Sequence, residues 1–470
     1  MEQKKYLTGK ERISYIIAAF GRSGIYNLMS MFLLIFYTDA VKMNPVTAGA
    51  IIVGCRVFDA FNDPIMGVIV DKTRSKWGRY KPYLLFSPAL VLISTVLLFM
   101  SPFDVTENYT AAVIYAAVTY IFWGVCFTIQ DVPFWGMSSA ITPLETERNS
   151  FLSTARLGST FGGILPTLVL PILAENMGSG KGYFLGGVIF AVLGACLSVI
   201  PFFTCKERVE PEEKAPTLRE TVSVIFQNKV LLIMVISSIL GSTMVMAQIS
   251  SSYISTYLVT NKGIFDGWLM TAMSVAIGIG MVPSMVIMPV LRKKFDLKQI
   301  YIGSSAFGAI AHILCFLALR SGIGTAGGIN VYILMVFLVF MGVPLGIYNV
   351  ITYAIIADSV DYLEWKTGKN AGGVCFSFQT LLSKINAGIA SLATSVMLAV
   401  FAFQQPTGDT PLPQSETTLL GLLIMVTLIP AAGFILTIIP MIFNDYAGEK
   451  KAKIQKELAQ RREEAGSIQA

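Results

Sequence analysis

The sequence predicts an all-α polytopic membrane protein with twelve transmembrane helices in two six-helix halves. Of its 470 residues, 54% are hydrophobic and only 14% are charged, and the mean hydropathy is +0.65. Soluble proteins carry about 25% charged residues. Long apolar runs recur along the whole chain, and the longest polar interruption, residues 206–229, divides them into six and six.

Each apolar run is long enough to cross about 30 Å of hydrocarbon as a helix. If both termini are cytoplasmic, 27 of the 35 Lys and Arg residues lie in cytoplasmic segments and four lie in the opposite loops. This bias predicts a multi-pass protein of the cytoplasmic membrane, and the lipid bilayer rather than nucleic acid accounts for the net charge of +6. The spans are expected at 11–39, 46–71, 81–101, 109–138, 151–176, 181–204, 230–259, 264–290, 299–320, 328–356, 371–403 and 416–442.

The polar segments define the expected domains. The N-terminal half is expected at 1–205, a cytoplasmic linker at 206–229, the C-terminal half at 230–445, and a cytoplasmic tail at 446–470 that is at best a short solvated helix. Two similar halves joined by a linker are typical of transporters. The six cysteines have no metal-binding or disulfide spacing, so we interpret them as packing residues.

The second expected span contains RVFDAFNDPIMG, which places three charged residues in the membrane. An ionised Asp there costs about 2.5–3.5 kcal/mol. Asp59 and Asp63 share one helix face, bordered by Asn62. Two such carboxylates repel each other unless a cation or a proton lies between them, and oxygen ligands suit hard cations. The pattern therefore predicts a Na⁺ or H⁺ site. The alternative is that Arg56 neutralises the pair in an ion-pair cluster that only locks helices together.

The fourth expected span contains FTIQDVPFW, in which Thr128, Asp131 and Trp135 line one stripe. A carboxylate accepts hydrogen bonds from sugar hydroxyls, and an indole ring covers the apolar face of a sugar. Pro133 loosens the helix, which is tolerated where a helix lines a cavity. These residues predict a site for a polyhydroxylated ring. The alternative for Trp135 is an anchor at the membrane interface.

Further basic residues lie inside other spans. Arg156 either extends to the cytoplasm or lines a site, and Arg22 lies deep in the first span. Lys384 is near the centre of the eleventh span, and the mid-membrane acids all belong to the first half, so we expect an ion pair between the halves. The one histidine, His312, is interpreted as a packed residue.

Four motifs occur in order along the chain: RVFDAFNDPIMG, DKTRSKWGRYKPYLLF, TIQDVPFWGM and ADSVDYLEWKTGK. Together they resemble the glycoside–pentoside–hexuronide:cation symporters, a branch of the major facilitator superfamily, over nearly the whole chain. The resemblance implies the major facilitator fold and symport of a glycoside, pentoside or hexuronide with a monovalent cation. It implies no cofactor other than the coupling ion, Na⁺ or H⁺.

The resemblance also implies roles for individual residues. The family's cation ligands correspond to Asp59, Asn62, Asp63 and Thr128. Its sugar pocket corresponds to Asp131, Trp135 and Arg156, with Arg22, Gln379 and Lys384 nearby. In the family a charged loop after the tenth span acts as a cytoplasmic gate, and its counterparts here are Asp358, Asp361 and Glu364.

The sequence departs from the melibiose permeases of this family at three pocket positions. Ser23 replaces an acid of the first span, Phe127 replaces a tyrosine of the fourth, and Asn349 replaces an aromatic residue of the tenth. The galactoside pocket is therefore not intact, and losing an acid makes it more cationic. We expect a glucuronide or other anionic sugar, or alternatively a xyloside or plant-derived glycoside. The complete Asp/Asn/Asp/Thr set favours Na⁺, although the same carboxylates could bind a proton.

Two other functions remain open from the sequence: a carrier of a lipid-like amphiphile, and a sensor that binds sugar without moving it. An integral membrane enzyme is not expected. The chain has one histidine, and the sequence has no His/Asp metal-binding cluster and no phosphate-binding loop.

Overall fold

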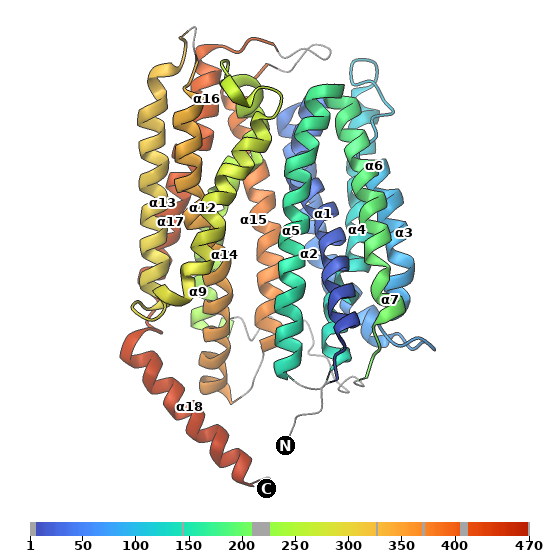
Figure 1. Ribbon diagram of the computed structural model, residues 1–470, viewed down its shortest axis with the longest axis vertical. Coiled ribbons are helices and arrows are strands. Elements are labelled where there is room, and N and C mark those ends of the chain that lie inside the picture. The colour runs from blue at the N-terminus through green and yellow to red at the C-terminus, as the bar shows by residue number, and fades with distance from the viewer. Residues whose placement is uncertain are drawn as a thin grey trace. The chain divides into compact units, whose positions relative to one another are not determined.

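A computed structural model describes residues 6–142, 145–208, 226–325, 328–368, 372–404 and 412–468. All regular elements in these residues are helices, which confirms the predicted all-α class (Figure 1). The helices form two compact units, α1 to α7 and α9 to α18. Most of the expected linker, 206–229, lies outside the described residues, so the domain boundaries remain a prediction.

The first unit begins with a well-capped helix. The Thr8 side chain accepts a hydrogen bond from the Glu11 backbone, and the Glu11 side chain accepts one from the Thr8 backbone, which forms a capping box. Asn44 caps the next helix through its side chain. The helices of this unit are α1 (Gly9–Ile35, continued by the π-helical turn η1, Phe36–Ala40), α2 (Pro45–Lys72), α3 (Lys81–Leu98), α4 (Tyr109–Ile141), α5 (Glu145–Met177), α6 (Ser179–Ser198) and α7 (Ile200–Thr204).

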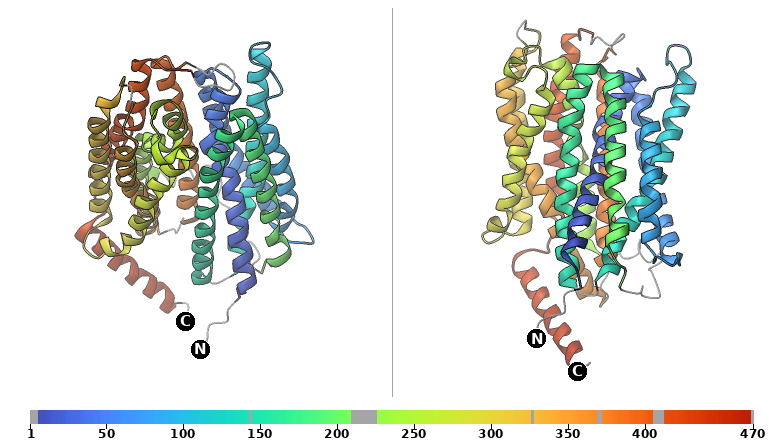
Figure 2. Two further views of the ribbon diagram at one scale, coloured as in Figure 1. Left: turned by 45° about the horizontal axis from the view of Figure 1, so that its top comes forward. Right: turned by 45° about the vertical axis from the view of Figure 1, so that its right-hand side comes forward.

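Within the first unit, α1 packs along α5 and α6, as both views of Figure 2 show. The close approach of α1 and α5 depends on a glycine pair, Gly158 and Gly162. A methyl group at Gly162 would overlap the carbonyl oxygen of Phe20, and one at Gly158 would overlap that of Ile16. Small residues four apart are a common means of close helix packing in membranes. This contact brings the middle of α1 next to α5.

The second unit contains a broken span. Its seventh-span helices, α9 (Lys229–Leu240) and the segment Ser242–Leu258, are bent by 47° at Gly241. The segment Ser242–Leu258 consists of η2 (Ser242–Val245), α10 (Met246–Ile249), α11 (Ser251–Tyr253) and η3 (Ile254–Leu258). The remaining helices are η4 (Gly263–Phe265), α12 (Leu269–Leu291), α13 (Leu297–Leu319), η5 (Arg320–Gly322), α14 (Val331–Thr367), α15 (Gly372–Val400), α16 (Glu416–Val426), α17 (Leu428–Ile442) and α18 (Gly448–Ile468).

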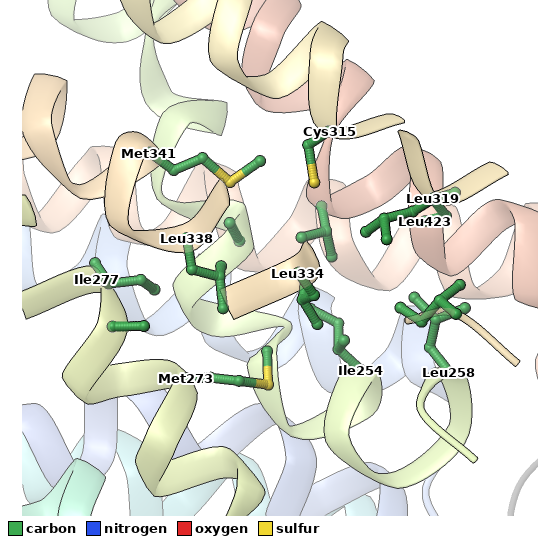
Figure 3. Close-up of a cluster of buried hydrophobic side chains, with 14 of the residues drawn as sticks. Ile254, Leu258, Met273, Ile277, Cys315, Leu319, Leu334, Leu338, Met341 and Leu423 are labelled. Carbon is green, nitrogen blue, oxygen red and sulfur yellow. The ribbon is translucent and has the colours of Figure 1, made fainter. Parts of the chain in front are cut away.

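A large buried apolar cluster of the second unit joins the broken seventh span to α12, α13, α14 and α16 (Figure 3). In Figure 3, Leu334 and Leu338 of α14 lie between Met273 of α12 and Cys315 of α13. All four side chains are nearly inaccessible. The N-terminal part of α14 is therefore fixed by apolar packing on several sides.

Ten helices of the described residues are long and apolar enough to cross a membrane, and the bent seventh span makes eleven. α2 has the required length but carries Arg56, Asp59 and Asp63. Every one of the twelve expected spans thus coincides with a helix or with a bent helix pair.

Two expectations about the segments beside the spans were wrong. The residues after 356 were expected to form a loop, but α14 continues as a helix to Thr367 and ends at Gly368, which has the left-handed φ of 72°. A charged sequence can extend a membrane helix into solvent because its backbone hydrogen bonds remain internal. The tail was expected to be at best a short solvated helix, but α18 spans 21 residues and buries Ile454 and Leu458.

Candidate functional site

The predicted cation ligands come together between α2 and α4. The Thr128 hydroxyl donates a hydrogen bond of 2.8 Å to Oδ1 of Asp63. Asp59 is 3% exposed, and Asp63 and Asn62 are half-buried. The amide Nδ2 of Asn62 is buried without a hydrogen-bond partner among the described residues. The cluster offers carboxylate, amide and hydroxyl oxygens, and this donor set fits a hard cation such as Na⁺.

Arg56 is buried one turn before Asp59, and its hydrogen bonds run to α1. Its guanidinium donates to the Tyr26 hydroxyl at 3.2 Å and to Oγ of Ser30 at 3.3 Å, and it lies 5.5 Å from the centre of the Tyr26 ring. Its charge also interacts electrostatically with Asp59. These contacts place one base beside the carboxylate pair and bind α2 to α1.

Gly124 is a member of this site that the sequence reasoning missed. It lies one turn before Thr128 on the stripe of α4 that already includes Asp131. A Cβ atom at Gly124 would lie 2.5 Å from Oδ1 of Asp59, so any larger residue would displace that carboxylate. The signal in the sequence was its spacing from Thr128, but a single glycine in an apolar helix has no specific meaning by itself.

Gly124→Ala is expected to displace the Asp59 carboxylate and to weaken binding at the predicted cation site about tenfold, which corresponds to roughly 1.4 kcal/mol. The matched control is Gly54→Ala on α2, where an added Cβ has no neighbour within 4 Å. Titration of the two purified variants with Na⁺ or H⁺ measures the effect. Equal cation dependence in Gly124→Ala and Gly54→Ala would show that the close approach is unimportant.

The predicted sugar residues of the first unit form a second cluster, which joins α1, α4 and α5. Arg22 of α1 makes a buried ion pair with Asp131 of α4. The Arg22 guanidinium lies 4.9 Å from the Trp135 ring centre and 5.0 Å from that of Phe134. The guanidinium of Arg156 lies 5.1 Å from the same Trp135 ring. Two cations therefore stack on one indole, an arrangement that cation–π attraction stabilises.

The burial of this cluster varies across it. Arg22 and Asp131 are each 7% exposed, Trp135 is half-buried, and Arg156 is exposed. Trp135 thus has a partly accessible ring flanked by guanidinium groups. Ser23 occupies the position of the family's first-span acid and is buried. Its Oγ accepts a long hydrogen bond of 3.4 Å from the Asn27 amide.

The other predicted sugar residues belong to the second unit. Lys384 of α15 is 4% exposed. Gln379 belongs to α15, but its side chain lies outside the described residues. Asn349 of α14 is exposed. The ion pair expected between Lys384 and an acid of the first half remains a prediction.

His312 is a packed residue, as expected. It is 1% exposed, its Nδ1 lies 2.7 Å from the carbonyl oxygen of Gly308, and its ring lies 5.3 Å from that of Phe434.

The three predicted gate carboxylates, Asp358, Asp361 and Glu364, lie on the last turns of α14 rather than in a loop. Asp358 forms an ion pair of 2.5 Å with Lys451 of the tail helix. Nothing in the sequence indicated this partner, because nearly a hundred residues separate the two.

Comparison with known proteins supports a transporter family. The family model described as MFS/sugar transport protein matches residues 14–447. A putative sulfoquinovose importer of Salmonella typhimurium is 28% identical over 99% of this chain and 95% of that protein. The isoprimeverose transporter of Lactiplantibacillus pentosus is 25% identical over 94% of this chain and 89% of that protein. Among solved structures, a point mutant of the nucleoside transporter NupG matches with a TM-score of 0.65 at 13% identity, covering 93% of this chain and all of that one, which shows a shared fold.

Proposed function

Because the chain belongs to the MFS/sugar transport protein family and is therefore a membrane transporter rather than an enzyme, we propose that it moves a sugar or glycoside together with Na⁺ or H⁺ across the cytoplasmic membrane. The observation that carries this proposal is the double role of α4. Thr128 of this helix contacts the carboxylate cluster, and Asp131, about one turn further on, contacts Arg22. One helix thus touches both candidate sites.

The cation acts first in this mechanism. When Na⁺ or H⁺ binds between Asp59 and Asp63, it cancels the repulsion of two carboxylates held on one face. Thr128 is bonded to Asp63, so the orientation of α4 responds to the occupancy of the cation site. Asp131 and Trp135 follow on the same helix and become arranged for the sugar. Alternating access then comes from rocking of the two halves.

Coupling has a definite size in such a scheme. The cation raises the affinity for sugar, and by linkage the sugar raises the affinity for the cation by the same factor. Typical coupling free energies of about 1–3 kcal/mol correspond to roughly 5–150-fold changes in affinity. A symporter of this kind is expected to bind its sugar measurably more tightly when the coupling ion is present.

The substrate we favour is a sugar with an anionic group. Arg22 and Arg156 meet at the Trp135 ring, so a carboxylate or sulfonate bound over that indole would lie near guanidinium groups suited to bidentate hydrogen bonds. The similarity to a putative sulfoquinovose importer is consistent with this choice, because sulfoquinovose is a sulfonated sugar. Because the chain is also similar to an isoprimeverose transporter, a neutral xyloside is the alternative substrate.

The test is uptake of labelled glycosides into proteoliposomes under imposed Na⁺ or H⁺ gradients, with a glucuronide and a neutral xyloside in the panel. We expect uptake of the glucuronide driven by a Na⁺ gradient. Uptake driven only by a pH gradient would make Asp59 and Asp63 a proton site. Uptake of the xyloside alone would overturn the anionic substrate.

The same vesicles distinguish the rival functions. Sugar that binds but shows no counterflow would indicate a sensor. A folded protein that moves no sugar but is inhibited or stabilised by lysolipid would indicate a carrier of amphiphiles. The half-buried Trp135 and the buried polar pair Arg22–Asp131 favour the sugar over an apolar ligand.

A further inference from the structure

The tail helix α18 packs against the C-terminal end of α14 within the second unit. Ile454 and Leu458, one turn apart on α18, are 3% and 4% exposed, whereas their neighbours Lys453, Gln455 and Lys456 are exposed. In Figure 1, α18 begins beneath the helices of this unit and continues away from them. One face of the helix is therefore buried against its own unit, and the opposite face is open.

Polar contacts fix the register of this packing. Lys451 and Asp358 form an ion pair of 2.5 Å, and their side chains are only 19% and 14% exposed. The indole Nε1 of Trp365 donates a hydrogen bond of 2.8 Å to Glu457, and Arg461 donates one of 2.9 Å to the carbonyl oxygen of Trp365. These contacts extend over three turns of α18.

The segment that leads into α18 is held as well. Lys298 of α13 donates hydrogen bonds to the carbonyl oxygens of Ile442 at 2.6 Å and Asn444 at 2.9 Å. Tyr446 is 3% exposed, and its ring meets that of Tyr362 of α14 at 5.6 Å, edge to face. A tail that served only as a solvated extension would need neither these contacts nor buried apolar residues.

We propose that α18 is a latch on α14 and that Lys451 is a positioning residue, which holds the gate carboxylate Asp358 and with it the C-terminal end of α14. This inference rests on the proposed function and on the gate role that the family resemblance implies for the α14 carboxylates. α14 is anchored at its N-terminal end by the apolar cluster of Figure 3, and the latch adds an ion pair and apolar contacts at its C-terminal end. The rate of gate movement then depends on a helix that contains no predicted sugar or cation residue.

Two adjacent lysines allow a matched test. Lys451 reaches α14, whereas Lys450 pairs with Asp445 of the same tail segment at 2.6 Å, is half exposed, and lowers the pKa of Asp445 through that hydrogen bond. Lys451→Ala and Lys450→Ala remove the same charge from the same helix. Lys451→Arg keeps the charge, and Leu458→Ala loosens the apolar side of the latch without altering any charge.

Two measurements are made on the full-length protein in proteoliposomes. The first is amide hydrogen exchange across residues 448–468. We expect at least tenfold faster exchange in Lys451→Ala and Leu458→Ala, and near wild-type exchange in Lys450→Ala and Lys451→Arg. Equal protection of α18 in Lys451→Ala and Lys450→Ala would overturn the latch. This measurement needs no substrate, so it is independent of the proposed function.

The second measurement is the initial rate of sugar uptake. We expect the maximal rate of Lys451→Ala to change at least threefold while its sugar KM stays within twofold of wild type, and we expect Lys451→Arg to restore the rate. A merely structural role would lower the amount of folded protein without changing the rate per folded molecule. An unchanged rate per molecule in Lys451→Ala, with wild type active, would overturn the positioning role. Absence of uptake by wild type would instead contradict the proposed symport.

Discussion

Asp59→Cys is expected to retain sugar binding and to lose the stimulation of that binding by the coupling cation. The substitution replaces one of the two carboxylates that face the cation with a thiol. The ion then binds the sugar-bound and the sugar-free protein almost equally, so it no longer raises the affinity for sugar. The loss should equal the full coupling, roughly 5–150-fold in sugar affinity. Equilibrium binding of the transported sugar with and without the ion, in purified protein, measures it directly.

The control for this variant is Asp104→Cys. Asp104 lies in the exposed connection between α3 and α4, where it accepts hydrogen bonds from Thr106, so the same chemical change is made outside the site. Its cation stimulation should match that of wild type. If Asp59→Cys retains the wild-type cation dependence, the carboxylate pair is not the coupling site, and the alternative of a structural cluster around Arg56 gains support.

Asp131→Leu is expected to be the most destabilising of the variants considered. It leaves the Arg22 guanidinium buried without its carboxylate, and breaking a buried ion pair in this way costs about 3–5 kcal/mol. The double variant Arg22→Met/Asp131→Leu removes both charges and should recover most of that loss, because an apolar pair needs no compensation. Thermal denaturation in detergent compares the three proteins.

Transport gives the complementary result. Neither variant should take up sugar. Asp131→Leu lacks the carboxylate that accepts hydrogen bonds from the sugar, and the double variant lacks both that carboxylate and the Arg22 guanidinium. Stability recovered together with transport would show that the pair only holds α1 against α4. A double variant no more stable than Asp131→Leu would mean that the unpaired Arg22 charge is not the cause of the lost stability.

The fold was largely predictable from the sequence because hydrocarbon imposes a simple rule. Each span must be long, apolar and helical, since no water satisfies backbone groups within the bilayer. All twelve expected spans accordingly coincide with helices. The same rule made Asp59 and Asp63 conspicuous. A charge inside a span is costly, so such residues usually mark a functional site.

Helix ends were less predictable. The bilayer rule no longer applies once a helix leaves the membrane, so the charged sequence after 356 was mistaken for a loop. Local chemistry decides there instead, and the helix ends at Gly368. The tail was underestimated for a related reason: Ile454 and Leu458 look like two isolated apolar residues in a charged segment until α14 is placed against them.

The sequence by itself therefore determined the class of protein, its spans, and the residue types available for a cation and a sugar, because these follow from composition, length and the cost of charge in lipid. Which residues meet was decided only by tertiary structure. The room that Gly124 leaves for Asp59, the stacking of Arg22 and Arg156 on Trp135, and the pairing of Lys451 with Asp358 all join segments distant along the chain. Helical periodicity identifies the face on which a residue lies, but the partner opposite that face is fixed only when the helices pack.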